Sequence, residues 1–559
     1  SGDVLVRVNR TWRLGESALA PEAHFFEGTY TEAPDPAACG PRHGPYTVAP
    51  GNGWVRAAAA ASATLPSNDI FINLYRGTDL VAQGDLGTSP ETVTYEPAGG
   101  LPAGDYFVEV CPFTPPPAPP MPPYTYSGSL LFEATELPAT DPVPRWAFFA
   151  ASPPLDHSTV DTRVTGCWFA GPGCDLELAN LAARAPWDHD FTINAPTFTT
   201  TGNAALSAES WLSPLTPSVP YRPVSAERSY VYPWANAWNV SRCDPLTLQH
   251  TGGLLPDNDI DAAVANLFAL HNRMHDWSYH LGFTEVNGNA QFKNLGLTAA
   301  TRENDPEVGN AQAGAVTGGA PSYQGRDNAN QITLNDGIPP ITNMYLWQPI
   351  GGAAYPPCVD GDFDASVIAH EYGHMIQSRM IDPDNGLSGD HGRAMGESWS
   401  DLTAAELLNG LGLVPIADEN PFAVGPYVTG DKQRGIRNFP MNDSPLNFSN
   451  LDYDPVGTAS VSPHSNGEIW SAVNFDIAES LNAKYDAQFP SEDAVLQERC
   501  ARGELPADAC PGNRRWAQLM FDGFLLQPSG STIAAPRVGP TSRCSRSIPV
   551  RATRWSTRR

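Results

Sequence analysis

The N-terminal quarter of the chain alternates hydrophobic and polar positions over short runs. Four such runs, separated by turn-forming residues, span 69–75, 91–95, 104–110 and 126–133. A period of two predicts half-buried β-strands, because successive side chains of a strand point to opposite faces. Several short strands at this spacing are typical of a β-sandwich. We therefore expect an all-β domain over residues 1–136, interrupted by an extended Pro-rich loop at 112–123.

The hydrophobic period changes after residue 255. Apolar residues recur three and four positions apart between 259 and 280, which predicts a helix that is capped by Asp257 or Asp259 and stopped by Gly282. The Gly- and Ala-rich stretch 309–325 is expected to be a loop. Further helices are predicted at 364–380, 394–408, 464–481 and 514–526. Strands first and helices later indicate the α+β class.

The composition indicates the boundaries between the strand-rich and the helix-rich regions. We predict a Pro-rich linker at 137–144 and an irregular, β-rich stretch at 145–255. Residues 256–530 are expected to form the core of the second domain. The last acidic residue is Asp522, and seven Arg follow it, so 531–559 is predicted to be an Arg-rich, disordered tail.

The charge balance excludes some classes of partner. The chain has 61 acidic and 33 basic residues and a net charge of -28. Such a surface repels nucleic acids and anionic membranes. The sequence has no run of eighteen apolar residues, so no membrane span is predicted.

Nine cysteines are spread along the chain without a Cys-x-x-Cys pair, which argues against a thiolate zinc site and for disulfides. Closeness in sequence pairs Cys167 with Cys174 and Cys500 with Cys510. The pairs that merely remain are Cys39–Cys111 and Cys243–Cys358, with Cys544 left over. Disulfides indicate an oxidising compartment, so we expect a secreted protein. The alternative is a set of buried thiols.

The helix predicted at 364–380 contains the sequence His370-Glu371-Tyr372-Gly373-His374. Residues four apart lie on one face of a helix, so the two imidazoles can bind one Zn²⁺. Glu371 is then placed to accept a proton from a water on the metal as general base. The alternative is an amphipathic helix with two partly buried histidines.

A second motif downstream supplies what this site still needs. Glu397 lies 23 residues after His374, far enough for a second helix to return and offer a third ligand. Asp401 follows one turn later, where it can accept the other ring N–H of His370 and fix its tautomer. Both halves together predict a catalytic zinc site.

Two other clusters have competing interpretations. His271 and His275 are also four residues apart, but no Glu follows the first, so we favour a structural role beside the cleft. Asp360, Asp362 and Asp364 alternate just before the zinc helix. They can cap that helix, which we favour, or help to bind Ca²⁺.

These motifs resemble those of the fungalysin family of secreted zinc metalloendopeptidases, relatives of thermolysin. The resemblance extends over about residues 260–530. It rests on the two motifs above and on Met274-His-Asp-Trp-Ser-Tyr-His-Leu-Gly-Phe283, Asn287-Gly-Asn-Ala-Gln291, Asp327-Asn-Ala-Asn330, Met344-Tyr-Leu-Trp347 and His464-Ser-Asn-Gly-Glu-Ile-Trp470.

The resemblance implies a thermolysin-like fold, with a β-rich upper lobe, a helical lower lobe and the zinc helix on the floor of the cleft. It also implies that His464 stabilises the oxyanion of the tetrahedral intermediate, a task that requires a donor facing the metal. The alternative for His464 is a surface loop histidine. Asn328 and Ala329 resemble the edge segment that hydrogen-bonds an extended substrate.

A second resemblance concerns the N-terminal runs. Asn68-Asp-Ile-Phe-Ile-Asn-Leu-Tyr75 and Leu101-Pro-Ala-Gly-Asp-Tyr-Phe-Val-Glu-Val110 are similar to the bacterial pre-peptidase C-terminal domain, a secreted jelly-roll module. The resemblance covers roughly 80 residues.

The sequence thus predicts a secreted, monomeric zinc endopeptidase that acts on proteins or peptides, with His370, His374 and Glu397 as ligands. One alternative is an adhesion or binding protein that carries a remnant metalloprotease domain. Another is a zinc aminopeptidase of the same clan, which needs a carboxylate for the free amine of its substrate. The usual Gly-x-Met-Glu-Asn motif for that carboxylate is absent from the sequence.

Overall fold

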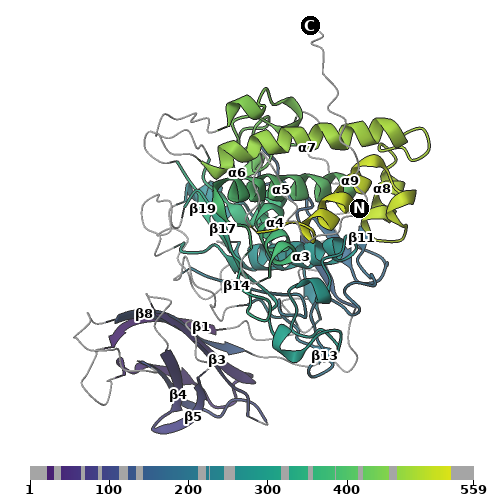
Figure 1. Ribbon diagram of the computed structural model, residues 1–559. Helices are drawn as coiled ribbons and strands as arrows, with labels where there is room; N and C mark the ends of the chain where they lie inside the picture. The colour runs from purple at the N-terminus through teal and green to yellow at the C-terminus, as the bar shows by residue number, and fades with distance from the viewer. Residues whose placement is uncertain are drawn as a thin grey trace.

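We describe the protein from a computed structural model (Figure 1). The structure describes the residues 22–30, 39–63, 70–85, 91–97, 99–112, 124–133, 143–211, 222–225, 227–243, 259–315, 326–349, 357–383, 386–412, 419–451 and 462–529. The predicted tail at 531–559 and most of the predicted linker and Pro-rich loop lie outside these residues. The structure combines strands and helices, in agreement with the α+β class.

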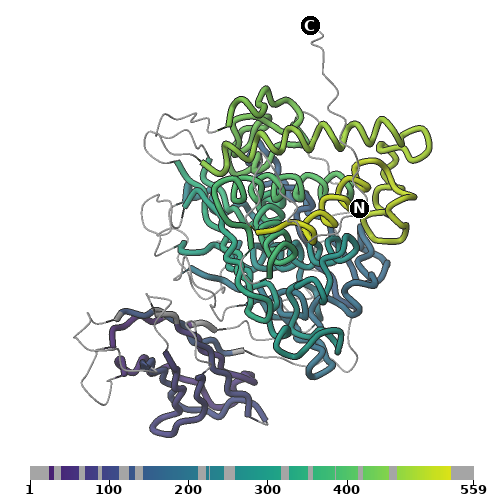
Figure 2. Tube along the Cα trace, in the orientation of Figure 1, coloured from purple at the N-terminus to yellow at the C-terminus, as the bar shows by residue number. Residues whose placement is uncertain are grey.

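The N-terminal strands form two four-stranded antiparallel sheets, with the orders β1-β8-β3-β6 and β2-β7-β4-β5. The strands are β1 (Glu22–Tyr30), β2 (His43–Val48), β3 (Arg56–Ala63), β4 (Ile70–Arg76), β5 (Asp79–Gly84), β6 (Glu91–Tyr95), β7 (Gly104–Pro112) and β8 (Tyr124–Glu133). Both sheets contribute to one hydrophobic cluster, which includes Ala59, Leu74, Val108 and Phe132. In Figure 2 this purple part lies to one side of the other elements.

The four alternating runs predicted as strands correspond to β4, β6, β7 and β8. The alternation did not indicate β3, because its sequence Arg-Ala-Ala-Ala-Ala-Ala-Ser-Ala is mainly a run of alanines without a regular exchange of apolar and polar positions.

The rest of the chain carries short strands and then long helices. The strands are β9 (Arg145–Phe148), β10 (Val164–Cys167), β11 (Leu176–Glu177), β12 (His189–Asp190), β13 (Ala195–Pro196), β14 (Ala205–Glu209), β15 (Ser229–Tyr230), β16 (Glu307–Ala311), β17 (Ala329–Ile332), β18 (Ile341–Met344), β19 (Leu346–Trp347) and β20 (Val359–Asp360). The helices are α2 (Ala237–Ser241), α3 (Ile260–Tyr279), α4 (Ala365–Ile381), α5 (Gly389–Gly410), α6 (Pro426–Thr429), α7 (Pro463–Tyr485), α8 (Ala494–Ala501) and α9 (Gly512–Phe524).

One sheet positions the candidate site. It has the order β14-β16-β18-β17, so β17 is an edge strand, antiparallel to β18. Helix α3 packs on this sheet and on α4, and α4 in turn packs against α5 and β17. The nearly complete burial of α3 makes it the centre of this part of the molecule.

The structure corrects two details of the predicted pattern. Asp259 precedes α3, but its carboxylate does not cap that helix and instead accepts the backbone N–H groups of Ala235 and Ala237, whereas Asp257, the other predicted cap, lies outside the described residues. The start of the predicted loop 309–325 belongs to the buried strand β16. Gly309 suits this strand because a Cβ there would lie 2.7 Å from Ser207 Oγ and 2.8 Å from Leu267 Cδ2.

Four disulfides join the cysteines in the predicted pairs. Their Cα–Cα distances are 4.1 to 5.9 Å, and the pairs are Cys39–Cys111, Cys167–Cys174, Cys243–Cys358 and Cys500–Cys510. Cys544 lies outside the described residues. Cross-links of this number are characteristic of proteins from oxidising compartments.

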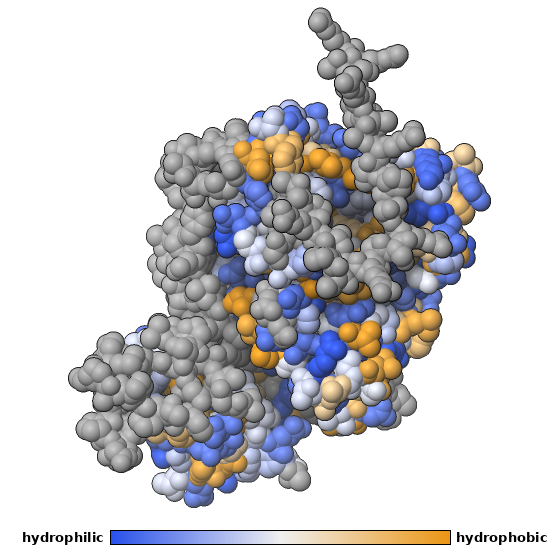
Figure 3. Space-filling model, viewed as in Figure 1, coloured by the Kyte–Doolittle hydropathy of each residue, from blue (hydrophilic) through white to orange (hydrophobic). Residues whose placement is uncertain are grey.

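The visible surface mixes hydrophobic and hydrophilic residues in small groups (Figure 3). One group of hydrophobic residues lies over α7, where Val473 and Ile477 are exposed. Within the described residues, no helix has both the length and the hydrophobicity that crossing a membrane requires.

Candidate metal centre

The helix that carries the first two candidate ligands is firmly anchored at its start. The Asp364 carboxylate accepts the backbone N–H groups of Ser366 and Val367, which caps α4 as predicted. The Ser366 hydroxyl donates to Asp364 and accepts the backbone N–H of Gly425, so the cap also ties α4 to the loop before α6. His370 and His374 follow on one face of this fixed helix.

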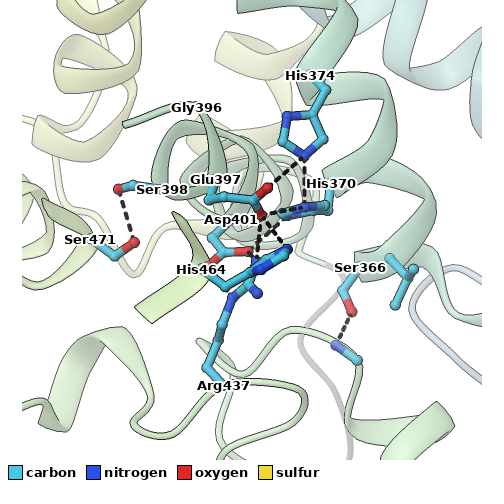
Figure 4. Close-up of polar contacts among 12 residues, drawn as sticks. Ser366, His370, His374, Gly396, Glu397, Ser398, Asp401, Arg437, His464 and Ser471 are labelled. Atoms are coloured by element: carbon cyan, nitrogen blue, oxygen red, sulfur yellow. Dashed lines mark hydrogen bonds and ion pairs between the residues drawn. The ribbon is translucent and has the colours of Figure 1, made fainter. Parts of the chain in front are cut away.

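The three predicted ligands converge (Figure 4). His370 Nε2 lies 3.1 Å from His374 Nε2 and 3.5 Å from Glu397 Oε2, and His374 Nε2 lies 3.7 Å from Glu397 Oε1. Two ligands at 2.0–2.1 Å from a tetrahedral ion are roughly 3.4 Å apart. The three side chains therefore fit one zinc ion, and they form a group that can hold a metal.

Asp401 fixes the orientation of His370. Its Oδ1 atom lies 2.8 Å from His370 Nδ1, so the ring can donate there and leave Nε2 free for a metal. Helices α4 and α5 pack against each other, and His370 and Asp401 both lie on the faces that meet.

Arg437 holds the carboxylates of this site from the other side. Its Nε and Nη2 atoms donate to the two oxygens of Asp401, each at 2.8 Å, and Nη2 lies 3.3 Å from Glu397 Oε2. No sequence motif pointed to Arg437, which belongs to an irregular loop between α6 and α7. Only its contacts reveal it.

Glu468 positions the loop that carries Arg437. Its two carboxylate oxygens accept the backbone N–H groups of Asn438 and Phe439, directly after Arg437. Glu468 lies on α7, one turn after His464, so one helix supports both the Arg437 loop and His464. Glu468 lies within the motif 464–470 that resembles the fungalysin family, but the sequence alone assigned it no role.

His374 also has a polar neighbour on its outer nitrogen. Gln377 Nε2 lies 3.1 Å from His374 Nδ1 and donates to the Gly396 carbonyl oxygen at 3.0 Å. Gln377 is on the same helix, three residues on. Spacing alone does not distinguish it from other polar residues of the helix.

The electrostatics of the group follow from burial and charge. Burial opposes a charge on His370, but its hydrogen bonds to Asp401 and Glu397 outweigh this and raise its pKa to about 10. Burial lowers the pKa of His374 to about 4. Burial would raise the pKa of Asp401, yet Arg437 and His370 lower it to about 2. The carboxylates are thus held as anions, the form that binds a cation.

Glu371 follows His370 on α4. It is 7% exposed, and burial raises its pKa to about 7. A carboxyl group with a pKa near neutrality is suited to accept and return protons. Glu371 lines the same cleft as the three ligands.

His464 lies in the first turn of α7 and faces the metal ligands (Figure 4). Its Nε2 atom is 3.3 Å from Glu397 Oε2, and its side chain is 58% exposed. The structure thus brings His464 to the cleft and not to a remote surface loop.

A cleft of about 740 Å³ covers the group. Asn328 and Ala329 line it at the start of the edge strand β17. Val367 and Ile436 add apolar wall near His370. An extended peptide can pair with such an edge.

The other sequence clusters have structural contacts. His271 is fully buried behind the zinc helix, with its ring 5.8 Å from that of Tyr372, and burial lowers its pKa to about 3. His275 lies between Asp276 and Gln291. Neither belongs to a group of described side chains that can hold a metal.

Asp360 and Asp362 are also tied to protein groups. Asp360 accepts the backbone N–H of Asp362 and the side-chain amide of Gln312, and Asp362 accepts the backbone N–H of Gln312. These contacts organise the turn before α4. A role in binding Ca²⁺ stays a prediction.

Comparison with known proteins gives one consistent result. Residues 177–538 match the model of the fungalysin metallopeptidase family. An extracellular metalloproteinase of Leptosphaeria maculans is 31% identical over 367 residues, which are 64% of this chain and 49% of that protein. Extracellular metalloproteinases of Aspergillus niger and Pyricularia oryzae are 30% and 28% identical over 50% and 66% of this chain, and over 40% and 53% of their own lengths. The chain thus spans about half the length of the relatives it matches.

Proposed function

This chain belongs to the fungalysin family of metallopeptidases, and from that membership we propose that it is a secreted zinc endopeptidase that hydrolyses internal peptide bonds. The observation that carries the proposal is the convergence of His370, His374 and Glu397 under a cleft that also contains Glu371. Secretion is supported by the four disulfides and by the relatives, which are named extracellular.

A zinc ion held by these three ligands would lower the pKa of a bound water and polarise the scissile carbonyl. Glu371 accepts the proton of the attacking water and then delivers it to the leaving amine. Its buried position, with a pKa of about 7, suits both transfers. Asp401 and Arg437 keep His370 in the orientation that binding requires.

His464 is proposed to donate a hydrogen bond to the oxyanion of the tetrahedral intermediate. Its exposed ring in the first turn of α7 faces the place where that charge develops, beside Glu397. Donors aimed at developing charge stabilise the transition state more than the bound substrate.

Asn328 and Ala329 are proposed to align the substrate. An extended peptide that adds to the β17 edge would present its backbone to the metal ligands below. By the family resemblance, a bulky apolar residue is expected on the leaving-group side, and we propose that it packs against Val367 and Ile436, two apolar residues that line the cleft.

The endopeptidase proposal is favoured over a remnant site because the ligands, the neighbouring Glu371 and the Asp401 contact are all present together. It is favoured over an aminopeptidase by the family match, whose relatives are named metalloproteinases, and by the absence of the Gly-x-Met-Glu-Asn motif.

The test compares cleavage of casein and of a blocked, internally quenched peptide with cleavage of an aminoacyl substrate that has a free amine. We expect activity on the first two, its loss with a chelator and its return with zinc, at one zinc per chain. Preference for the free-amine substrate would favour the aminopeptidase. Full activity in a folded sample that holds far less than one zinc per chain would refute the zinc mechanism.

A further inference from the structure

A second cavity lies away from the metal centre, between α3, α8 and β11. Its volume is about 70 Å³. In Figure 1, α8 and β11 are drawn close together at the right of the molecule. No residue lines both this cavity and the cleft. The volume exceeds the space that a single water needs and suits a ligand of a few heavy atoms.

The cavity is lined by a cation that contacts no carboxylate of the described residues. Arg273 lines it, and the Arg273 guanidinium makes no hydrogen bond or ion pair with any described residue. Its Nη1 atom is buried and unpaired. Burial lowers the pKa of Arg273 to about 10, which leaves it protonated at neutral pH. The side chain as a whole is partly exposed, with Nη1 as its buried unpaired atom, and a partly buried cation of this kind can bind an anion.

The neighbouring acids do not supply that anion. Asp276 is already engaged, because its oxygens accept hydrogen bonds from His275, Asn180 and Trp187. Glu498 is half exposed and lies 3.6 Å from Arg502. Both raise the pKa of Arg273 from a distance without contacting it.

A second donor lines the same cavity. His280 Nε2 is buried and has no hydrogen-bond partner. Phe148 lies beneath Arg273, with the guanidinium carbon 5.1 Å from its ring centroid, and so supports the guanidinium from one side. Trp187, Trp277 and Leu178 form apolar walls around the remaining space.

We propose that this cavity binds a small organic carboxylate, with Arg273 as its main contact and His280 as a second donor. The planar guanidinium matches the two oxygens of a carboxylate, and the apolar walls match a short alkyl group. A phosphate is disfavoured, because its larger negative charge would face Asp276 and Glu498. The inference concerns a site separate from the cleft and does not depend on the proposed protease activity.

The probes are acetate and propionate, with acetamide as the neutral isostere and with chloride and phosphate as inorganic anions. Thermal unfolding of the zinc-loaded protein is followed at constant ionic strength as each probe is added. We expect acetate and propionate to raise Tm in a saturable way, because a ligand that binds only the folded state stabilises it. Acetamide should not do so.

Arg273→Met should abolish this rise, and Arg514→Met is the matched control. Arg514 is buried, shares with Arg273 an unpaired Nη1 atom and lies against Trp277, but it does not line the cavity. Its variant should keep the carboxylate-dependent rise. Carboxylate that binds at the metal centre would raise the Tm of both variants equally. The difference in the Tm rise between the two variants therefore reports on the cavity alone.

If Arg273→Met does not fold, Arg273→Lys replaces it and should show a half-saturating acetate concentration at least several-fold higher. An undiminished rise in the Arg273 variant would overturn the proposal. So would an equal rise with acetamide, chloride or phosphate, or no saturable rise in the wild-type protein.

Discussion

Glu371 and His464 enter the cleft from different helices and are proposed to do different work. Glu371 follows His370 on α4, whereas His464 lies in the first turn of α7 with its Nε2 atom 3.3 Å from Glu397 Oε2. Neither is required to hold the metal. Their substitutions should therefore separate zinc binding from turnover.

Glu371→Gln should keep its zinc and lose about 10²–10⁴-fold in kcat, because an amide cannot accept the proton of water. The effect on KM should be small. Zinc content and kcat are measured on the same sample. A variant that remains fully active would remove Glu371 from the mechanism, and one that loses its zinc would show that the ligand set is wrong.

His464→Phe should also keep its zinc and lose on the order of 10²–10³-fold in kcat, the usual effect of removing one oxyanion donor. The ring is 58% exposed, so the variant should fold normally. Wild-type turnover in this variant would leave the zinc chemistry intact and place the oxyanion donor elsewhere.

Glu406 offers a residue-level test away from the cleft. Burial raises its pKa to about 7, against an ordinary value of 4.5. The folded state therefore binds more protons than the unfolded state between about pH 4.5 and 7. Stability from this group is fully present below that window and is lost as pH rises through it.

We compare the free energy of unfolding of Glu406→Gln with that of the wild-type protein at each pH. This difference should favour the variant more at pH 8 than at pH 5, by on the order of 2 kcal/mol. The side chain can still accept from Asn513. Denaturant unfolding at both pH values measures this, with the exposed Glu492→Gln as the control for lost charge. An equal difference at pH 5 and pH 8 would contradict the expectation.

At the scale of elements, the cap of α4 links local structure to the site. Asp364 accepts two backbone N–H groups of the first turn and the hydroxyl of Ser366. Because α4 carries both histidines and Glu371, its start sets where all three lie.

Asp364→Ala should lower the free energy of unfolding by about 1–2 kcal/mol, as loss of a cap does. Asp364→Asn keeps one oxygen acceptor and should lose less. Denaturant unfolding of both variants ranks them. If both variants lose the same free energy of unfolding, the hydrogen bonds of the Asp364 carboxylate are not the source of the stabilisation.

Periodicity predicted the long helices well but their starts less well. The helix predicted at 394–408 begins five residues earlier, at Gly389. The prediction missed this start because two Gly residues in the first turn add nothing to the apolar periodicity. Strand β16 was missed for a related reason. Its small residues fit against α3, and this is a tertiary requirement that leaves no alternation in the sequence.

At the scale of the whole molecule, the N-terminal strands have their own hydrophobic cluster and contribute none of the candidate site residues. Within the described residues, Leu131 of β8 belongs to the hydrophobic cluster around Trp146 and so joins these strands to the rest. The division into separate domains stays a prediction.

Deletion of residues 1–141 should leave a soluble protein that cleaves a short peptide at a rate within several-fold of the full chain, with a lowered Tm because the contact of Leu131 is lost. Peptide cleavage and thermal unfolding measure the two effects. A soluble, zinc-loaded product that cleaves no peptide would mean that the N-terminal strands complete the active site.

The sequence alone predicted that His370, His374 and Glu397 would lie together with Asp401 behind them, and the structure brings these side chains together. This was feasible because His370, His374, Glu397 and Asp401 lie on two helices whose period sets which side chains share a face. The sequence also predicted the disulfide pairs, two from closeness along the chain and two only as the pairs that were left, and the structure has all four.

Only the tertiary structure revealed Arg437 beside Asp401, Glu468 beneath the Arg437 loop, and the unpaired Arg273. Each depends on segments that are far apart in the chain and meet through packing, and irregular loops have no period that would signal the meeting. A lone arginine in a sequence has many suitable partners. Only the tertiary structure shows whether an acidic side chain packs close enough to pair with it.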